Sequence, residues 1–209
     1  MKDVTLIQLF LCVCVGVSLS AACGFRVFIP MLIVSIGVHF FGIHVNEGLQ
    51  WVGSWTALVV LSTAAICEVF TYYIPWLDNL LDLINTPLAL IAGTILMSGM
   101  LPELNPCLKW CMAGVVGGGA AGVTKATTTV LRSVSSVTTG GLGNNVVSTV
   151  ENACSTVFSI FAFVIPIIAF VVVVSFLGLM VIVARKLVLK ARRLKAERVQ
   201  MQSPCLQRP

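Results

Sequence analysis

The sequence predicts an all-α protein: a polytopic membrane helix bundle with broken or re-entrant helices and two pseudo-repeated halves. Three observations support this prediction. Hydrophobic residues make up 58% of the 209 residues and charged residues only 10%, whereas a soluble domain carries about a quarter charged residues. Several apolar runs reach the roughly 20 residues that a membrane helix needs. A pattern of small residues in the first half also recurs 98 residues later.

The first apolar run covers residues 4–43 and is too long for a single span. We expect residues 4–23 to form a mature membrane helix and not a cleaved leader, because the segment before it carries no net charge. Gly24 interrupts the run. The remainder is therefore either a second segment that meets the first near Gly24, or a re-entrant half-helix.

The next elements are placed by helix-start signals. Ser54 fits the N-cap of a second long apolar helix. The amphipathic segment that follows predicts an interfacial helix, with Asp78 and Asp82 on a solvated face. Thr86 and Pro87 then suit the N-cap and first position of a new helix. About 15 apolar residues follow, which is short for a span and fits a tilted, half-buried or re-entrant helix.

A polar ribbon, "TKATTTVLRSVSSVTTGGLGNN" (Thr124–Asn145), interrupts the second half. In a helix, its cations and several hydroxyls recur every three or four residues and form one stripe. The stripe includes Lys125, Thr128, Arg132 and Ser136. Three interpretations stay open: a surface helix or loop outside the bilayer, the lining of a polar cavity, or internal pairing with acids such as Glu68.

Two further charges stand in apolar surroundings, where an ionisable residue is expensive and usually functional. Glu68 lies inside the second long apolar helix, and Arg26 follows the interruption at Gly24. Three roles are open for Glu68: to bind a proton or cation, to neutralise Arg26 or Lys125, or to be exposed at the membrane interface. Together with the stripe, Arg26 and Glu68 complete the residues proposed to line a substrate path.

The chain ends in a long apolar helix and a basic tail. "STVE" at 148–151 has the pattern of a capping box, and the helix is expected to continue to about residue 184 with a kink at Pro166. Residues 185–209 hold eight Lys or Arg and one Glu, a net charge of +7. The positive-inside rule places this tail in the cytoplasm. There it would contact anionic lipid headgroups, and nucleic acid is not an expected partner.

Two triplets of small residues are related by the 98-residue offset, and each occupies one face of a helix. Such faces let membrane helices approach closely. The triplets are Gly16, Ser20, Gly24 and Gly114, Gly118, Gly122. They predict a first half at 1–105 and a second half at 106–186, followed by the tail at 187–209. The two faces would either pack within one chain or form a homo-oligomer.

The ordered motifs "GFRVFIPML", "WVGSW", "LDNLLDLINTPLALIAG" and "TKATTTVLRSVSSVTTGGLGNNVVSTVEN" resemble the bacterial membrane family catalogued as domain of unknown function 4126. The resemblance covers about residues 10–180. It implies a small multi-span protein of the bacterial inner membrane. It implies no established activity.

The functional expectation is a small transporter or translocase in the lipid bilayer, for a small anion or a phosphate-bearing lipid. Cations next to hydroxyls suit such cargo. The alternative is a structural or scaffold membrane protein that associates through its Gly-rich faces. An enzyme is not expected, because the sequence offers no Ser–His pair and no close pair of acids within one span. Neither a cofactor nor a metal is expected, since His39 and His44 are the only histidines.

Overall fold

The computed structural model describes residues 6–72, 75–139 and 143–202. Every regular element within these residues is helical, which confirms the predicted class. The α-helices are α1 (Leu6–Phe25), α2 (Phe28–Phe41), α3 (Trp55–Thr71), α4 (Pro75–Met100), α5 (Pro106–Met112), α6 (Gly119–Thr139), α7 (Asn144–Val164) and α8 (Pro166–Gln202). A short 3₁₀-helix, η1 (Glu47–Gly53), precedes α3, and a π-helix, η2 (Ala113–Gly118), precedes α6.

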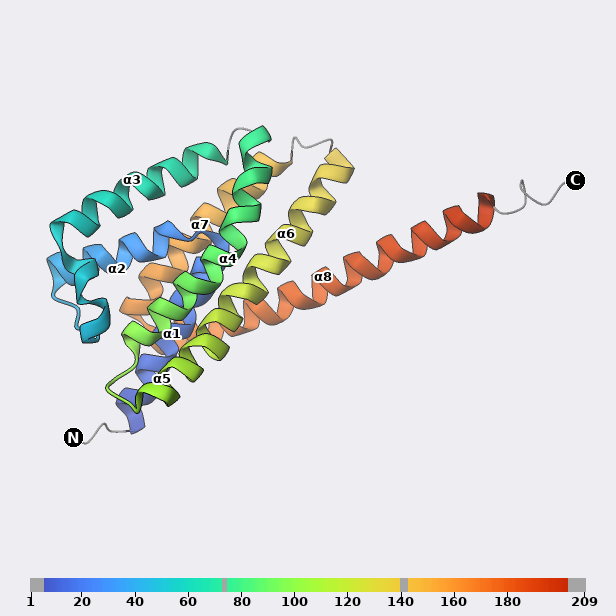
Figure 1. Cartoon of the computed structure of the whole chain (residues 1–209). Helices are drawn as coiled ribbons and strands as arrows, with labels where there is room; N and C mark the ends of the chain where they lie inside the picture. The colour runs from blue at the N-terminus through green and yellow to red at the C-terminus, as the bar shows by residue number, and fades with distance from the viewer. Residues whose placement is uncertain (1–5, 73–74, 140–142, 203–209) are drawn as a thin grey trace, which may run out of the picture.

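Helix α1 is the centre of the bundle. It packs against α4, α6, α7 and α8, while α2 and α3 form a pair at one side (Figure 1). Helix α8 crosses α1 and continues beyond the bundle. Phe170 of α8 meets Phe10 near the start of α1, with ring centroids 6.4 Å apart, and Phe176 meets Phe25 at its end, at 5.8 Å. The two helices therefore run in the same general direction.

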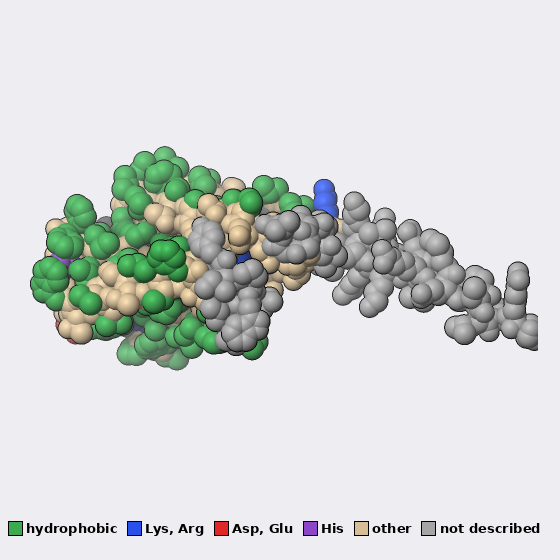
Figure 2. All heavy atoms as spheres, turned by 90° about the horizontal axis from the view of Figure 1, so that it is seen from above, with side chains coloured by type: hydrophobic (Ala, Val, Ile, Leu, Met, Phe, Trp, Pro, Cys, Tyr) green, Lys and Arg blue, Asp and Glu red, His purple; other side chains and the backbone are tan. Residues whose placement is uncertain are grey.

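The lengths and surface of the helices fit a multi-pass membrane protein. Among the described residues, four helical segments are long and apolar enough to cross a bilayer: Leu6–Phe25, Leu81–Met100, Asn144–Val164 and Pro166–Val183. A fifth crossing results if η1 and α3, which bend by 72° at their junction, count as one broken span. Figure 2 shows a face on which hydrophobic side chains dominate and charged ones are few.

Two predicted helix boundaries agree with the structure. Helix α1 ends at Phe25 and α2 begins at Phe28, so the long first run breaks within two residues of Gly24. Ser54 caps α3, and its hydroxyl accepts a hydrogen bond from the Ala57 amide at 3.1 Å. Both boundaries depend on local signals, which sequence patterns capture well.

The helix start predicted at Thr86 and Pro87 is wrong. Helix α4 is continuous from Pro75 to Met100 and holds Pro87 in its interior. The Thr86 hydroxyl does not cap the helix but donates to the Asp82 carbonyl, one turn earlier, at 2.7 Å. Proline removes one backbone hydrogen bond, a loss that membrane helices tolerate when neighbouring helices hold the backbone. The interfacial segment and the short apolar segment are thus one helix.

Pro166 breaks the last helix completely where a kink was expected. Ile165 leaves helical geometry (φ −141°, ψ 75°), α7 ends at Val164, and α8 begins at Pro166. The predicted single helix is therefore two. The pseudo-repeat is not shown either: the break between α1 and α2 has no counterpart at an offset of 98, because α6 runs unbroken from Gly119 to Thr139.

The small residues of α1 pack as expected, but those of the second triplet do so only in part. A Cβ atom at Gly16 or Gly24 would clash with α4 or α6, and Ser20 donates to the Gly93 carbonyl at 2.8 Å. In the second triplet, Gly118 and Gly122 face α4, whereas a Cβ atom at Gly114 would have no neighbour within 4 Å among the described residues. Helix α4 lies against Gly16 and Ser20 of the first triplet and Gly118 and Gly122 of the second, whereas Gly24 meets α6 at Ala121 and Thr124.

Gly117 makes the close approach that was expected of Gly114. A Cβ atom at Gly117 would lie 2.6 Å from the Gly93 carbonyl oxygen, and one at Gly93 would lie 3.0 Å from that of Gly117. The π-helical geometry of η2 explains the change of residue. A π turn holds more residues than an α turn, so a spacing of four no longer keeps side chains on one face.

Candidate functional site

The break between α1 and α2 leaves backbone amides that need a partner. Val27 precedes α2 without a side-chain cap, and the first amides of a helix have no carbonyl within the helix to bind. Glu68 of α3 fills this role. Its Oε1 accepts from the Val27 amide and its Oε2 from the Phe28 amide, both at 3.0 Å. The carboxylate therefore sits at the positive end of the α2 dipole.

Tyr72, directly after α3, connects the surrounding polar groups. Its hydroxyl donates to Asp82 Oδ1 at 3.0 Å and accepts from Asn85 Nδ2 at 3.0 Å. Lys125 Nζ lies 3.4 Å from the same oxygen. The tyrosine ring faces two guanidinium groups, with the Cζ atoms of Arg26 and Arg132 3.6 and 4.5 Å from its centroid. The buried tyrosine thus contacts groups from three other segments of the chain: the α1–α2 junction, α4 and α6.

Glu151 of α7 binds both arginines. Its carboxylate accepts from Arg132 Nε at 3.0 Å and from Arg132 Nη2, and its Oε2 lies 3.5 Å from Arg26 Nη2. Ser148 accepts from Arg132 through its hydroxyl, at 3.0 Å, and from Arg26 through its carbonyl, at 3.2 Å. The predicted capping box is therefore wrong. Helix α7 begins at Asn144, so Ser148 and Glu151 lie inside it and face the arginines.

Asp82 and Lys125 form the second ion pair, with Asp82 Oδ1 2.8 Å from Lys125 Nζ. Asp82 Oδ2 also lies 3.8 Å from Arg132 Nη1. The prediction that Asp82 lies on a solvated face is wrong, because its side chain is only 18% exposed and faces α6. The Asp78 side chain lies outside the described residues. Asn85 completes the contacts by donating to Glu68 Oε1 at 3.1 Å.

We call this group the charge cluster. It consists of Arg26, Glu68, Tyr72, Asp82, Asn85, Lys125, Arg132, Ser148 and Glu151. Its three cations and three carboxylates balance formally, and Arg26 is wholly buried while Lys125 and Arg132 are 3% and 4% exposed. Removing such charges from water costs several kcal/mol each unless they are paired. The pairing of the ribbon's cations agrees with the internal-pairing interpretation, with Asp82 and Glu151 as the paired acids in place of Glu68.

Two donors of the charge cluster have no hydrogen-bond partner. The Nε and Nη1 atoms of Arg26 are buried, and no acceptor among the described residues contacts them. Buried donors are nearly always satisfied, and an unsatisfied one costs about 1–3 kcal/mol. Arg26 can therefore donate further hydrogen bonds to an acceptor beside the cluster.

The remaining predicted path residues lie on α6 but outside these contacts. The Thr128 hydroxyl is buried and donates to the Lys125 carbonyl of its own helix at 3.0 Å. Ser136 shares hydrogen bonds with the Asn144 side chain, at 3.0 and 3.2 Å, and so joins α6 to the start of α7. The structure therefore gathers Arg26, Glu68, Lys125 and Arg132, and leaves Thr128 and Ser136 at the side of the cluster.

The sequence pattern of the family described as Domain of unknown function (DUF4126) matches residues 13–186. The chain belongs to this family. Every member of the charge cluster lies within the matched range. No curated protein and no solved structure is matched by the chain.

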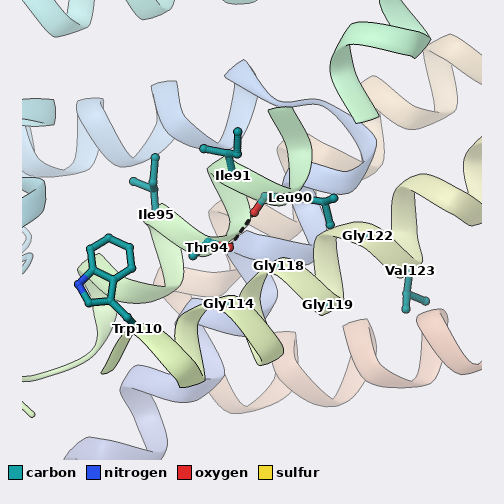
Figure 3. A pocket seen from close by; sticks show the side chains of 10 residues that line it. All are labelled: Leu90, Ile91, Thr94, Ile95, Trp110, Gly114, Gly118, Gly119, Gly122 and Val123. Carbon is teal, nitrogen blue, oxygen red and sulfur yellow. Dashed lines mark hydrogen bonds between the residues drawn. The ribbon is translucent and has the colours of Figure 1, made fainter. Parts of the chain in front are cut away.

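The DUF4126 helices leave two hollows of interest. One borders the charge cluster, and the other borders the Gly-rich face of η2 and α6. A pocket of about 250 Å³ between α3 and α4 reaches Glu68 and Asn85, with Cys67 and Thr71 also on its wall. A wider groove of about 540 Å³ runs along the outside of η2 and α6 (Figure 3). Trp110 lies at one end of this groove, and Gly114 and Gly119 form part of its floor. Within the described residues, no three His, Cys, Asp or Glu side chains are arranged to hold a metal ion.

Sequence analysis missed five members of this site: Tyr72, Asp82, Asn85, Ser148 and Glu151. Asp82 was expected on a solvated face and Glu151 in a capping box. Tyr72 looks like ordinary apolar filling in a membrane helix, and only the convergence of distant cations reveals its role. The position of Asn85 beside Asp82 could have been predicted, because residues three apart lie on nearly the same face of a helix. Ser148 was named, but the local capping pattern concealed its contact with Arg132.

Proposed function

We propose that this DUF4126 protein is a small transporter or translocase for a small anion or a phosphate-bearing lipid. The observation that carries the proposal is the charge cluster, which is buried among apolar helices and includes two unfilled donors on Arg26. Ionisable residues within membrane helices commonly mark substrate or ion paths and proton relays. A pair of well-packed apolar residues would hold the helices at least as firmly.

In this proposal the three cations attract the anionic group of the cargo. Arg26 offers unfilled donors, while Lys125 and Arg132 are held in place by Asp82 and Glu151. The acids keep the empty site neutral in a medium of low dielectric constant. Thr128 and Ser136 extend the polar side of α6 beyond the cations and would border the path.

The test is a flux measurement on the purified full-length protein in liposomes. Uptake of radiolabelled phosphate and chloride is measured beside the movement of a fluorescent phospholipid between leaflets. We expect flux of one cargo class above that of empty liposomes, and a drop of about tenfold in Arg26→Gln. Arg185→Gln is the matched control, because Arg185 is exposed on α8. No flux of any cargo, or full flux in correctly folded Arg26→Gln, would refute the proposal.

The groove beside η2 favours a second candidate function, a scaffold that associates through its Gly-rich face. Gly114 and Gly119 have open space where a Cβ atom would stand, so another helix could approach there closely. Gly114→Leu fills the groove without a clash inside the chain. If the scaffold function is correct, this variant abolishes cross-linking between copies in native membranes and leaves anion flux unchanged. Equal cross-linking in the wild-type protein and in Gly114→Leu excludes the scaffold function.

We also propose an inner-membrane location in bacteria with a cytoplasmic C-terminus. Helix α8 continues to Gln202, past the exposed Arg185 and Lys186, and a basic flank after a span favours the cytoplasm. The tail would then contact anionic headgroups. The two pseudo-repeated halves, 1–105 and 106–186, stay a proposal as well. Activity after co-expression of the halves as separate chains would support it, and their failure to assemble would count against it.

A further inference from the structure

We infer that Glu68 occupies an oxyanion site, and that an anionic cargo binds by replacing this carboxylate as Glu68 takes up a proton. The inference rests on the proposed function and deepens it, since it names the chemistry of the cargo and its coupling to protons. The cargo class is an oxyanion, such as the phosphate of inorganic phosphate or of a lipid headgroup.

The first argument is the geometry around the Glu68 carboxylate. Each of its oxygens accepts one backbone amide at the start of α2, at 3.0 Å, and Oε1 also accepts from Asn85. Helix α2 has 14 residues. Paired backbone amides at a helix N-terminus are a typical binding site for phosphate and carboxylate groups. The protein's own carboxylate therefore stands where an oxyanion would bind.

The second argument is the unfilled capacity of Arg26, the residue before these amides. Its side chain is fully buried, yet its Nε and Nη1 atoms have no acceptor within the described residues. Its Nη2 atom is engaged by the Ser148 carbonyl and Glu151. A guanidinium group is the side chain best suited to bind an oxyanion through several N–H groups. Glu68 accepts from the Val27 and Phe28 amides and from Asn85, and not from these two Arg26 atoms. In this inference, a free oxyanion, which is not anchored on α3, must lie close enough to Arg26 to accept from them.

The third argument is charge balance. The charged groups of the cluster around Glu68 are Arg26 at the α1–α2 junction, Lys125 and Arg132 on α6, Asp82 on α4 and Glu151 on α7. The other titratable groups near Glu68 are uncharged: Tyr72 after α3, the buried thiol of Cys23 on α1, and Cys67 on α3. With Glu68 ionised the cluster is neutral. A bound monoanion would leave an excess negative charge unless Glu68 became neutral, and buried excess charge is very costly. One proton on Glu68 restores the balance.

The fourth argument is space for the displaced side chain. The pocket of about 250 Å³ between α3 and α4 borders Glu68 and is otherwise lined mostly by apolar groups such as Phe28, Leu81 and Leu88. A protonated carboxyl group enters such a pocket at far lower cost than an ionised one. The pocket thus gives the side chain a position outside the oxyanion site, and only in its protonated state.

The experiment compares phosphate binding by the wild-type protein and by Glu68→Gln, both full length in a maltoside detergent that carries no phosphate. Glutamine matches the size of the protonated side chain and removes the competing charge. Titration calorimetry with inorganic phosphate should give binding about tenfold tighter in Glu68→Gln. Glu103→Gln, a change at an exposed acid outside the cluster, should match the wild type. Arg26→Lys should weaken phosphate binding about tenfold in both backgrounds.

Proton uptake supplies a second measurement that does not require the variant to bind more tightly. In weakly buffered solution, phosphate binding should draw protons from the medium in the wild type and not in Glu68→Gln. The difference between the two proteins cancels the ionisation of phosphate itself. A parallel titration with a short-chain phosphatidic acid identifies the source of the oxyanion, because a lipid-specific site binds it far more tightly than inorganic phosphate.

The outcomes separate this inference from the proposed function. Tighter binding in Glu68→Gln together with proton uptake in the wild type supports the inference. Equal or weaker binding in Glu68→Gln, or equal proton uptake in both proteins, overturns it, while flux in liposomes would still support transport. If neither protein binds phosphate or phosphatidic acid, the oxyanion site is wrong, and the flux measurement alone decides whether the protein is a transporter of other cargo.

Discussion

The guanidinium carbon of Arg26 lies 3.6 Å from the centre of the Tyr72 ring. A cation at this distance over a buried aromatic face is stabilised by about 2 kcal/mol or more. The contact also fixes the position of Arg26, two of whose nitrogens have no hydrogen-bond partner among the described residues. Tyr72 therefore holds in place a buried cation that does not use all of its hydrogen-bond donors.

Tyr72→Phe should destabilise the fold by about 1–3 kcal/mol. The variant keeps the ring beneath Arg26 but removes the hydroxyl that contacts Asp82, Asn85 and Lys125. Tyr72→Leu should cost more, because it also removes the cation–π contact. Chemical unfolding in detergent micelles measures both. Equal losses in the two variants would show that the ring contributes nothing beyond the hydroxyl.

Arg132 and Glu151 should show strong energetic coupling. Arg132→Met and Glu151→Gln each leave a buried group without its main partner and should cost about 3–5 kcal/mol. The double variant should cost clearly less than the sum of the single variants, with a coupling energy of about 1–3 kcal/mol. Unfolding of the four proteins gives this coupling directly. Additive losses would mean that the ion pair is energetically unimportant.

Gly24→Ala and Gly114→Ala should have opposite effects. A methyl group at Gly24 meets the backbone of α6 at Ala121 and the side chain of Thr124, so it should force α1 and α6 apart and cost about 1–3 kcal/mol. At Gly114 no atom of the described residues is near, and alanine should stabilise the helix by up to about 1 kcal/mol. Thermal unfolding of the two variants is the check. A loss of stability in Gly114→Ala would reveal a partner in the groove.

Ser54→Ala should destabilise the start of α3 by about 1 kcal/mol, because it removes the acceptor of the Ala57 amide. Thr63→Ala is the control, since that hydroxyl bonds the Val59 carbonyl within its own exposed helix. Amide hydrogen exchange at residues 55–58 should rise in Ser54→Ala and not in the control. Unchanged exchange there would mean that the cap is not needed to hold this turn.

The agreement between sequence and structure depends on how local each signal is. The break near Gly24 follows from the excessive length of one apolar run, and Ser54 caps a helix through a contact three residues away. Pro87 misled because a proline signals either a helix start or a tolerated interior residue, and the packing of α4 decides between them. The pattern at Ser148 and Glu151 misled for a related reason, since their partner Arg132 belongs to another helix.

The candidate site was foreseeable in part. Arg26, Glu68, Lys125 and Arg132 attract attention because each is a charge in an apolar sequence. Their partners could not be assigned, since pairing depends on which helices meet. Asp82 was placed on a solvated surface because its own helix is amphipathic, yet the cations of α6 lie on that side. Tyr72 could not be identified, because an aromatic residue gives no sign that it will contact two arginines.

The common direction of α1 and α8 determines the sidedness of the whole protein. Phe170 and Phe176 meet α1 near its start and at its end, so the basic end of α8 and the end of α1 at Phe25 lie toward the same side of the bundle. We expect both ends to be on the same side of the bilayer. The buried charge cluster then lies nearer the side from which the tail leaves, and Leu6 lies at the opposite end of α1. Compartment reporters fused to the two termini should therefore give contrary signals.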